Sequence, residues 1–361
     1  MDKMVTDLNF YKGKRVLVTG HTGFKGAWMC KVLSMAKAHV TGFSLEPNTE
    51  PSLFEALKTD ENVDSIIGDI RDYNSLKSVF EKKRPEIIFH LAAQPIVRES
   101  YKNPLYTYQT NVMGTVNLLE CVRTMPERPK SVVVITTDKV YMNKEWEWGY
   151  REYEPLDGFD PYSNSKSCCE LAVHSYVNSF FSGEKLAVST ARAGNVIGGG
   201  DFAADRIIPD CVRAAYNGRN VEVRNRYSIR PYQHVLEPVF AYLMIAEKQY
   251  NDYSYAGYYN IGPDEYDCVS TGKLVGLFCE KWGNDLQWTA AESKGPHEAN
   301  FLKLDCSKLK KVFGWAPSWN IEKAVEKSVD WYKCYHENMD VDLLTENQIK
   351  EFYACLEEKN V

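Results

Sequence analysis

A glycine-rich turn between an apolar run and a segment of helical spacing places the strongest constraint on how this chain of 361 residues can fold. Residues 15–19 (RVLVT) form a continuous apolar run, the turn is Gly20-His21-Thr22-Gly23-Phe24-Lys25-Gly26, and residues 27–37 have helical spacing. Glycines at such a turn permit the close approach of a pyrophosphate, whose charge is favoured at a helix N-terminus. The spacing is GxxGxxG and not the stricter GxGxxG, so the turn predicts nucleotide binding mainly because it follows the first strand.

The first half of the chain continues this alternation of short apolar runs and helix-like segments. Near-continuous apolar strands separated by helices predict parallel strands buried on both faces, in a doubly wound α/β sheet. After Gly198 the regularity weakens, and we expect a smaller α+β lobe that binds substrate. The predicted domains are 1–195 and 196–361, with interleaving of their segments allowed. The predicted strands are 15–19, 39–43, 65–68, 86–92, 131–136 and 186–192, and the predicted helices are 27–37, 73–84, 105–124 and 163–181.

Composition excludes several classes of function. Lys and Arg number 43 against 49 Asp and Glu, a net charge of −6, which argues against the basic surface of a nucleic-acid binder. No apolar run approaches the length that spans a bilayer, so no membrane segment is predicted. The ten cysteines form no CxxC pair, so we predict reduced thiols and no metal site. Met1–Phe10 has no apolar core of signal-peptide length, and we expect a cytoplasmic protein.

The end of the second predicted strand leaves the choice of dinucleotide open. An acidic residue there would bind the ribose hydroxyls of NAD. Ser44 follows the strand and Glu46 comes two residues later, so no carboxylate occupies the strand end. No arginine stands there to hold the 2′-phosphate of NADP either. The balance of charge favours NAD.

Two groups of polar residues suggest redox chemistry on a hydroxyl. Tyr162 and Lys166 are one helical turn apart, and a nearby ammonium favours the phenolate, which is suited to taking a hydroxyl proton. The same spacing at Tyr73 and Lys77 falls on an earlier predicted helix. Residues 136–139 (TTDK) follow the fifth predicted strand, at the sheet edge where active sites form. An exposed helix pair and a plain strand-terminating loop remain the alternatives.

These residues belong to motifs that resemble the extended short-chain dehydrogenase/reductases and, within them, the branch of CDP-glucose 4,6-dehydratases. The resemblance runs from about Gly13 to Lys333 and implies a Rossmann-type fold that binds NAD. It also implies a cytoplasmic homodimer joined by a four-helix bundle from 105–124 and 163–181, which acts in lipopolysaccharide O-antigen biosynthesis. The matching motifs include GKRVLVTGHTGFKG, FHLAAQPIVRESY, TTDKVYMNKEWEWGYRE, DPYSNSK, RAGNVIGGGDFAADRIIP and SIRPYQHVLEP.

The resemblance implies conversion of CDP-glucose to CDP-4-keto-6-deoxyglucose and water, with hydride moving from C4 to NAD and returning to C6. Tyr162 takes the proton of the C4 hydroxyl, Lys166 lowers the pKa of Tyr162 and holds the nicotinamide ribose, and Thr137 binds the C4 oxygen. Asp138 protonates the departing C6 hydroxyl. Relatives acting on dTDP-glucose carry a glutamate in place of Lys139, which removes the C5 proton. Lys139 either does so as a desolvated neutral amine, the reading we favour, or acts electrostatically while another group takes the proton.

The resemblance also implies two sets of binding residues. Two arginines suit the substrate diphosphate because guanidinium groups bind phosphate oxygens bidentately. Asp69 has the alternative of a helix or turn cap, His234 has the alternative of a surface residue, and His90 is predicted to be a satisfied core histidine. The dinucleotide contacts are Gly20, Thr22, Gly23, Phe24, Asp69, Ile70, Ala92, Ala93, Thr110, Tyr162 and Lys166. The substrate contacts are Thr137, Asn195, Arg206, Arg230 and His234.

Two other functions are alternatives to the dehydratase. A sugar-nucleotide 4-epimerase of the same family shares the cofactor turn and the pair Tyr162 and Lys166. Epimerisation needs no acid to expel a C6 hydroxyl, so Asp138 and Lys139 favour the dehydratase. A catalytically silent dinucleotide-sensing or scaffold protein would be expected to lack the tyrosine or the lysine, and both are present.

Overall fold

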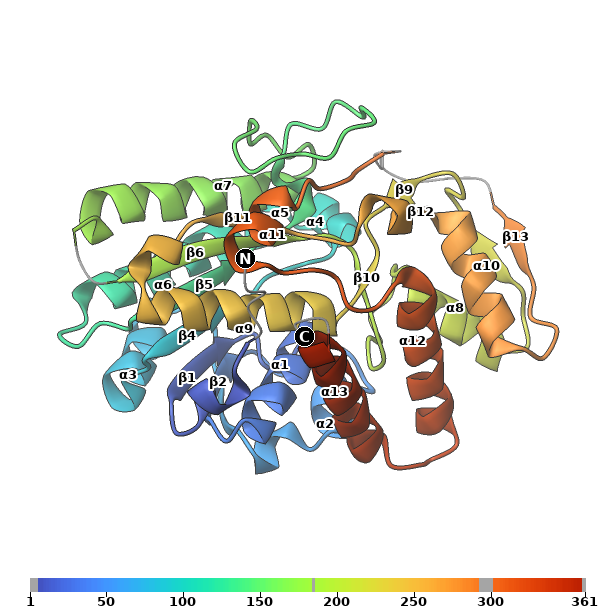
Figure 1. Cartoon of the computed structure of the whole chain (residues 1–361), viewed down its shortest axis with the longest axis horizontal. Coiled ribbons are helices and arrows are strands. Elements are labelled where there is room, and N and C mark those ends of the chain that lie inside the picture. Colours follow the sequence, from blue (N-terminus) through green and yellow to red (C-terminus); the bar gives the residue numbers. More distant parts are fainter. Residues whose placement is uncertain (1–5, 184–185, 292–300, 359–361) are drawn as a thin grey trace.

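A seven-stranded parallel sheet forms the centre of the computed structural model, with strand order β11-β6-β5-β4-β1-β2-β3 (Figure 1). The structure describes residues 6–183, 186–291 and 301–358, so parts of the predicted N-terminal and C-terminal segments (1–5 and 359–361) lie outside it. The six predicted strands are all present, and the predicted parallel α/β sheet is confirmed. The strands of this sheet are β1 (Arg15–Thr19), β2 (His39–Ser44), β3 (Asp64–Ile67), β4 (Ile87–His90), β5 (Ser131–Ile135), β6 (Ala187–Ala193) and β11 (Tyr258–Ile261).

The sheet separates two hydrophobic cores because neighbouring strand residues point to opposite faces. In β1, Val16 and Val18 belong to one core and Leu17 to the other. The first core is covered by α1 (Phe24–Met35) and α9 (Leu236–Asn251). The helices over the second core are α3 (Tyr73–Lys83), α6 (Gly114–Thr124) and α7 (Pro161–Tyr176). Burial on both faces explains why the strands read as continuous apolar runs.

Two predicted helices are interrupted by π-helical turns. The segment predicted at 105–124 consists of α5 (Pro104–Tyr108), a π turn at Gln109–Met113, and α6. The segment predicted at 163–181 is α7 followed by a π turn at Val177–Phe181. The first π turn buries Thr110 and Asn111.

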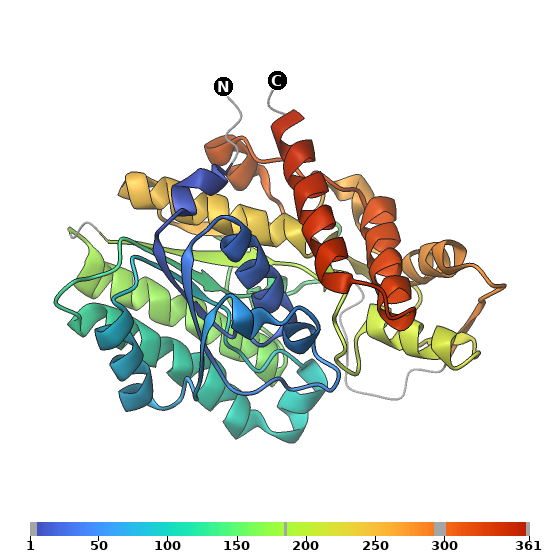
Figure 2. The same cartoon turned by 90° about the horizontal axis from the view of Figure 1, so that it is seen from below.

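The second half of the chain is divided between the sheet and a smaller lobe. The strand β11 extends the sheet and the helix α9 covers it, so residues 236–261 pack with the first predicted domain. The C-terminal helices α12 and α13 run beside each other (Figure 2). The remaining helices are α2 (Leu53–Ala56), α4 (Val97–Lys102), α8 (Ile207–Tyr216), α10 (Thr271–Trp282), α11 (Ser307–Phe313), α12 (Ile321–His336) and α13 (Val341–Glu358). The two-stranded pairs are β7 (Val196–Ile197) with β10 (Gln233–His234), β9 (Ile229–Arg230) with β12 (Val269–Ser270), and β8 (Val221–Val223) with β13 (Trp288–Ala290).

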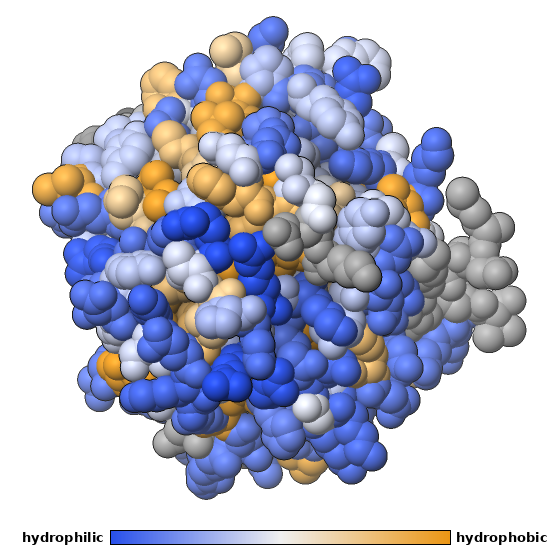
Figure 3. Space-filling model, turned by 90° about the vertical axis from the view of Figure 1, so that its left-hand side faces the viewer, coloured by the Kyte–Doolittle hydropathy of each residue, from blue (hydrophilic) through white to orange (hydrophobic). Residues whose placement is uncertain are grey.

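Within the described ranges, no helix is both long and apolar enough to cross a membrane. The face drawn in Figure 3 is mainly hydrophilic, with smaller hydrophobic groups between. All ten cysteines lie in described parts of the chain and are free thiols, as predicted. Because every strand of the sheet is parallel, the carboxyl ends of the strands meet at one edge, where their loops form the site described next.

Candidate active site

The turn after β1 requires glycine at two positions. Gly20 has φ of +77°, and a Cβ there would lie 2.7 Å from the backbone nitrogen of Ala92. A Cβ on Gly26 would lie 2.1 Å from the carbonyl oxygen of Gly20, so the first turn of α1 packs directly on the loop. This close packing directs the N-terminal end of α1 at the edge of the sheet, the arrangement that favours a bound phosphate.

The end of β2 carries neutral groups. Ser44 Oγ lies 2.9 Å from Thr22 Oγ1 and 3.0 Å from His21 Nδ1, and Thr22 also donates to the carbonyl oxygen of Leu45 at 2.8 Å. Burial lowers the pKa of His21 to about 4, so the imidazole is uncharged at neutral pH. Ser44 thus stands where an acidic residue would be expected to bind ribose, and it hydrogen-bonds to the glycine-rich turn after β1 instead.

Asp69 lies after β3 and does not cap the next helix. Asp72 is that cap, and its carboxylate accepts from the backbone nitrogens of Asn74 and Ser75. Asp69 forms an ion pair with Arg71, with 2.5 Å between Nη2 and Oδ2, and these hydrogen bonds hold the pKa of Asp69 below its usual value. Asp69 Oδ1 also accepts from the backbone nitrogen of Arg71 at 2.9 Å, so Asp69 caps the turn before the helix but not the helix itself. It also lines the cavity described below, so it remains a candidate for the dinucleotide.

The residues that follow β5 form a short hydrogen-bonded turn. Thr137 Oγ1 donates to Asp138 Oδ1 at 2.9 Å and accepts from the backbone nitrogen of Lys139 at 3.4 Å. Asp138 is only 1% exposed, and within the described chain its Oδ2 has no hydrogen-bond partner. Burial raises the pKa of Asp138, against the opposing effects of Lys139 and Thr137. Asp138 thus keeps its proton to a higher pH than an exposed aspartate, whereas Lys139 is only half-buried.

The helix α7 brings Tyr162 and Lys166 to the same strand end. Asp160 caps this helix by accepting from the backbone nitrogen of Ser163 at 3.0 Å. Lys166 Nζ donates to the carbonyl oxygen of Ile135 at 3.1 Å, and burial lowers the pKa of Lys166. Burial also raises the pKa of Tyr162 to about 12, against a hydrogen bond with Thr137. The predicted effect of Lys166 on Tyr162 stays a prediction for the enzyme with bound cofactor.

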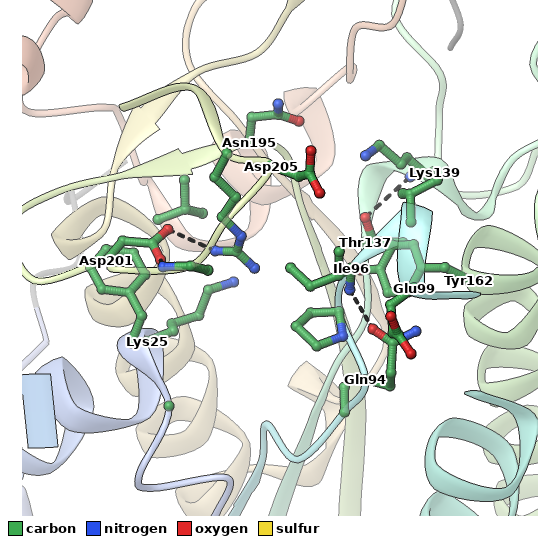
Figure 4. Close-up of a pocket in the computed structure, with 18 of the residues that line it drawn as sticks. Lys25, Gln94, Ile96, Glu99, Thr137, Lys139, Tyr162, Asn195, Asp201 and Asp205 are labelled. Carbon is green, nitrogen blue, oxygen red and sulfur yellow. Dashed lines mark hydrogen bonds and ion pairs between the residues drawn. The ribbon is translucent and has the colours of Figure 1, made fainter. Parts of the chain in front are cut away.

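These groups line one cavity of about 810 Å³. In Figure 4, Lys25 and Asp201 lie on one side of it, and Thr137, Lys139 and Tyr162 lie on the other. All but one of the predicted site residues are in its wall. They are Gly20, Thr22, Gly23, Phe24, Asp69, Ile70, Ala92, Ala93, Thr110, Thr137, Asp138, Lys139, Tyr162, Lys166, Asn195, Arg206 and Arg230.

The side of the cavity formed by the second lobe is rich in cationic and amide groups. Arg206 Nη1 forms an ion pair with Asp201 Oδ2 at 2.9 Å, which is drawn in Figure 4, and Asp201 raises the pKa of Arg206. Arg230, at the end of β9, and Asn195, after β6, line the same cavity. A ligand carrying two phosphates would find donors here that remain charged at every physiological pH.

Comparison with known proteins decides the family. The family described as GDP-mannose 4,6 dehydratase matches residues 17–328, which is most of the chain. The chain belongs to this family. CDP-glucose 4,6-dehydratase of Salmonella typhimurium is 46% identical over 355 residues, covering 97% of this chain and 99% of the relative. The dTDP-glucose 4,6-dehydratase of Haemophilus influenzae is 27% identical, covering 88% of this chain and 97% of the relative.

Solved structures support the fold of this GDP-mannose 4,6-dehydratase family member. A UDP-glucose 4-epimerase from Thermotoga maritima superposes with a TM-score of 0.78 at 21% identity, covering 89% of this chain and 99% of that one. A dTDP-glucose 4,6-dehydratase from Bacillus anthracis superposes with a TM-score of 0.73 at 22% identity, covering 91% and 99%. Epimerases and dehydratases share this architecture, so the chemistry must be argued from the site.

One predicted substrate contact of this family member has to be corrected. His234 is fully buried in β10, where its ring packs against Trp28 and Trp319 with centroid distances of 5.8 and 4.8 Å. It is outside the wall of the cavity described above. The aromatic residues that enclose it are distant in sequence, which is why the loop around His234 looked exposed.

The core histidine was predicted correctly. The ring of His90 bridges two hydroxyl groups, with Nδ1 at 2.7 Å from Thr19 Oγ1 and Nε2 at 3.0 Å from Thr115 Oγ1. It is 1% exposed, and burial lowers its pKa to about 3. This histidine therefore joins β1, β4 and α6 as a neutral hydrogen-bonding group.

Sequence reasoning missed Lys25 as a residue of the cavity. Its Nζ donates to the hydroxyl of Tyr242 at 3.2 Å. Desolvation, together with the nearby charges of Arg206 and Lys166, lowers the pKa of Lys25 to about 7. The available signal was a lysine within the glycine turn, at a position that packs toward the sheet edge.

Proposed function

We propose that this chain is an NAD-dependent CDP-glucose 4,6-dehydratase, a hydro-lyase that forms CDP-4-keto-6-deoxyglucose and water. The observation that carries the proposal is Asp138, a desolvated carboxyl group with a raised pKa, in the same cavity as Tyr162 and Lys166. A dehydratase needs such an acid to expel the C6 hydroxyl, whereas a 4-epimerase does not. The named Salmonella relative, which matches nearly the whole chain, supports the same choice of nucleotide.

The cavity fits a dinucleotide. The glycine cradle at Gly20 and Gly26 leaves no room for side chains, and Thr110 Oγ1 is a buried hydroxyl with no partner within the described chain. We infer that the residues from Gly20 to Phe24 hold the NAD diphosphate, that Asp69 and Ile70 hold its adenosine, and that Ala92, Ala93, Thr110 and Lys166 hold the nicotinamide ribose. When bound, NAD accepts a hydride from C4 of the sugar and later returns it to C6.

Tyr162 acts as the base for the C4 hydroxyl. Its hydroxyl group interacts with Thr137, which we infer also hydrogen-bonds the C4 oxygen. With a pKa of about 12 in the empty site, Tyr162 holds its proton at neutral pH. We infer that it becomes a competent base only when Lys166 turns from Ile135 toward the nicotinamide ribose, because an approaching ammonium favours the phenolate.

Asp138 and Lys139 act on the elimination. The new C4 ketone acidifies the C5 hydrogen, and Asp138 donates its proton to the leaving C6 oxygen as water forms. Lys139 lines the same cavity, and we infer that it takes the C5 proton as a neutral amine. Its half-buried position in the empty site means that bound substrate must supply the remaining desolvation.

Arg206, Arg230 and Asn195 are inferred to bind the substrate diphosphate and sugar. The Arg206 guanidinium is already held in place by Asp201 and presents its remaining N–H groups to a phosphate. Electrostatic attraction by two arginines in one cavity favours a nucleoside diphosphate over a neutral sugar.

The test is mass spectrometry and proton NMR of nucleotide sugars incubated with the purified protein and NAD, because a C4 epimer has the same mass as the substrate. We expect CDP-glucose alone to lose one water, with total NAD unchanged, while dTDP-, UDP- and GDP-glucose remain intact. Formation of the C4 epimer without loss of water would refute the dehydratase and leave Asp138 and Lys139 without a role in elimination. Dehydration of a different nucleotide sugar would refute only the choice of base.

We also infer a homodimer formed through α5, α6 and α7, by pairing of these helices into a four-helix bundle. Leu105, Met113, Leu171 and Phe180 are exposed by 70, 50, 55 and 46%, which leaves a hydrophobic face on these helices. Leu119 on α6 lies in the core beneath these helices and does not belong to this face. We further infer a cytoplasmic enzyme that supplies a deoxysugar precursor for lipopolysaccharide O-antigen.

A further inference from the structure

A buried ion pair lies directly behind the catalytic groups. Glu170, on α7, is 1% exposed, and its Oε2 accepts from Arg192 Nη2, on β6, at 2.7 Å. Arg192 is 2% exposed, and its Nη1 also donates to the hydroxyl of Tyr141 and to the carbonyl oxygen of Glu152, each at 2.9 Å. Buried charges are stable when they are paired and hydrogen-bonded, and both charges here are paired, although within the described chain Arg192 Nε has no hydrogen-bond partner.

Glu170 is the point where a helix and two strands are joined. Its Oε1 accepts from Thr136 Oγ1 at 2.5 Å, and its Oε2 accepts from Thr190 Oγ1 at 2.7 Å in addition to Arg192. Thr136 is the first residue after β5, and its backbone nitrogen donates to the carbonyl oxygen of Ala191 in β6 at 3.0 Å. One carboxylate thus connects α7, β6 and the end of β5.

The hydrogen bonds of Glu170 lie between the two groups of proposed catalytic residues, one after β5 and the other on α7. Thr136 immediately precedes Thr137 and Asp138, and Glu170 is one helical turn beyond Lys166 on α7. The ammonium of Lys166 donates to Ile135, the residue just before Thr136, so the helix and the strand end meet at two consecutive residues. A displacement of either element would alter the distance from the strand end to the lysine.

We propose that Glu170 is a positioning residue that locks the end of β5 against α7. Its bond with Thr136 holds Thr137 and Asp138 in register with the tyrosine and lysine of the helix. Arg192 neutralises the carboxylate and fixes its direction. The role of this junction in turnover rests on the proposed function, but the junction itself is a property of the empty protein.

The carboxylate also acts on the lysine through its charge. Burial lowers the pKa of Lys166, and Cys169 and Glu170 on the same helix oppose that effect. From other elements, Lys25 on α1 and His90 on β4 also interact electrostatically with Lys166. Removing the charge of Glu170 should therefore make Lys166 lose its proton at a lower pH.

Two threonine variants test the positioning role. Thr136→Val and Thr190→Val each remove one hydroxyl that donates to Glu170, but only Thr136 leads into the catalytic residues. We expect Thr136→Val to lower kcat by about 10- to 100-fold with little change in KM, as for a small misplacement of reacting groups. Thr190→Val should retain kcat within about 3-fold, since the hydrogen bond that it loses joins Glu170 to β6 and not to the end of β5. Equal losses in the two variants would overturn the proposal.

A titration without substrate tests the effect of charge. We would follow the 13Cε resonance of Lys166 in lysine-labelled protein, assigned with Lys166→Arg, and compare Glu170→Gln with Glu237→Gln. Glu237 is 1% exposed and accepts from the backbone nitrogens of Ser318 and Trp319, away from the cavity wall. We expect the titration midpoint of Lys166 to move to lower pH only in Glu170→Gln.

The two measurements separate this proposal from the proposed function. An unchanged Lys166 midpoint in Glu170→Gln would overturn the electrostatic part, whatever the enzyme catalyses. If wild-type protein failed to dehydrate CDP-glucose while the midpoint moved, the proposed function would fail and the junction would stand. If Glu170→Gln did not fold, the comparison of Thr136→Val with Thr190→Val would decide alone.

Discussion

Replacing Asp138 by asparagine should lower activity and raise stability together. Asparagine has nearly the same shape and keeps an acceptor for Thr137, but it has no proton to give to the C6 hydroxyl. General acid catalysis by a positioned side chain contributes about 10²- to 10⁴-fold, so we expect kcat to fall by that factor, which corresponds to about 3–5 kcal/mol. The binding groups for substrate and NAD remain, so KM should change little.

The stability change follows from the raised pKa of Asp138, which burial causes. The folded pKa lies above the unfolded value of about 3.9, so ionisation destabilises the fold. That destabilisation begins as pH rises through the unfolded pKa and is complete above the folded pKa, whereas an amide never ionises. A buried polar group without its partners costs about 1–3 kcal/mol, and the amide would also lack a partner at the position of Oδ2, so we expect removal of the charge to gain only about 1 kcal/mol at pH 7. With about 2.1 cal/mol/K of unfolding entropy per residue over 361 residues, Tm should rise by about 1 °C.

Initial rates with CDP-glucose and calorimetric unfolding at pH 7 measure the two changes. Asp267→Asn is the matched control, because burial also raises the pKa of Asp267 while its carboxylate accepts from the backbone nitrogen of Ile321, outside the cavity wall. The control should gain stability with kcat unchanged. Retention of wild-type kcat by Asp138→Asn would refute its role as the acid, and a lowered Tm would refute the desolvation argument.

Three further variants test the binding and assembly of the site. Tyr162→Phe removes the base and should lower kcat by about 10³-fold. The loss of its hydroxyl contact should change the free energy of unfolding by only about 1 kcal/mol. An effect confined to KM would contradict this role. Gly26→Ala places a Cβ 2.1 Å from Gly20 O and should weaken NAD binding at least about 10-fold in calorimetric titration, whereas Gly276→Ala, with its nearest atom at 3.9 Å, should not. Leu171→Glu should convert a dimer into monomers in light scattering, and a monomeric wild-type protein would refute the inferred interface.

The strands and the proposed catalytic residues were predictable because both leave local signals. The apolar run Val16–Val18 and the glycine turn that follows it predict a strand that is buried on both faces, and Val16 and Leu17 lie in opposite cores. Asp138 directly follows β5, and Tyr162 lies in the first turn of α7, the helix between β5 and β6, so the parallel topology places both at the carboxyl edge of the sheet. The local sequence pattern was therefore sufficient to predict where the cavity lies.

Features that depend on distant contacts could not be predicted. The strand β11 joins the sheet beside β6 although more than 60 residues separate them, so no local period links the two. His234 looked exposed because its enclosing residues, Trp28 and Trp319, come from opposite ends of the chain. The lowered pKa of Lys25 could not be predicted either, because it depends on burial by distant segments and on the charge of Arg206 from the second lobe.

The most direct test of the central claim is the fate of deuterium placed at C4 of CDP-glucose. During turnover with the purified protein and NAD, the account predicts a product that has lost one water and carries the deuterium at C6, because hydride leaves C4 and returns to C6 of the same molecule. Deuterium that remains at C4 of an epimer, or that is lost to solvent while water is eliminated, would contradict the account.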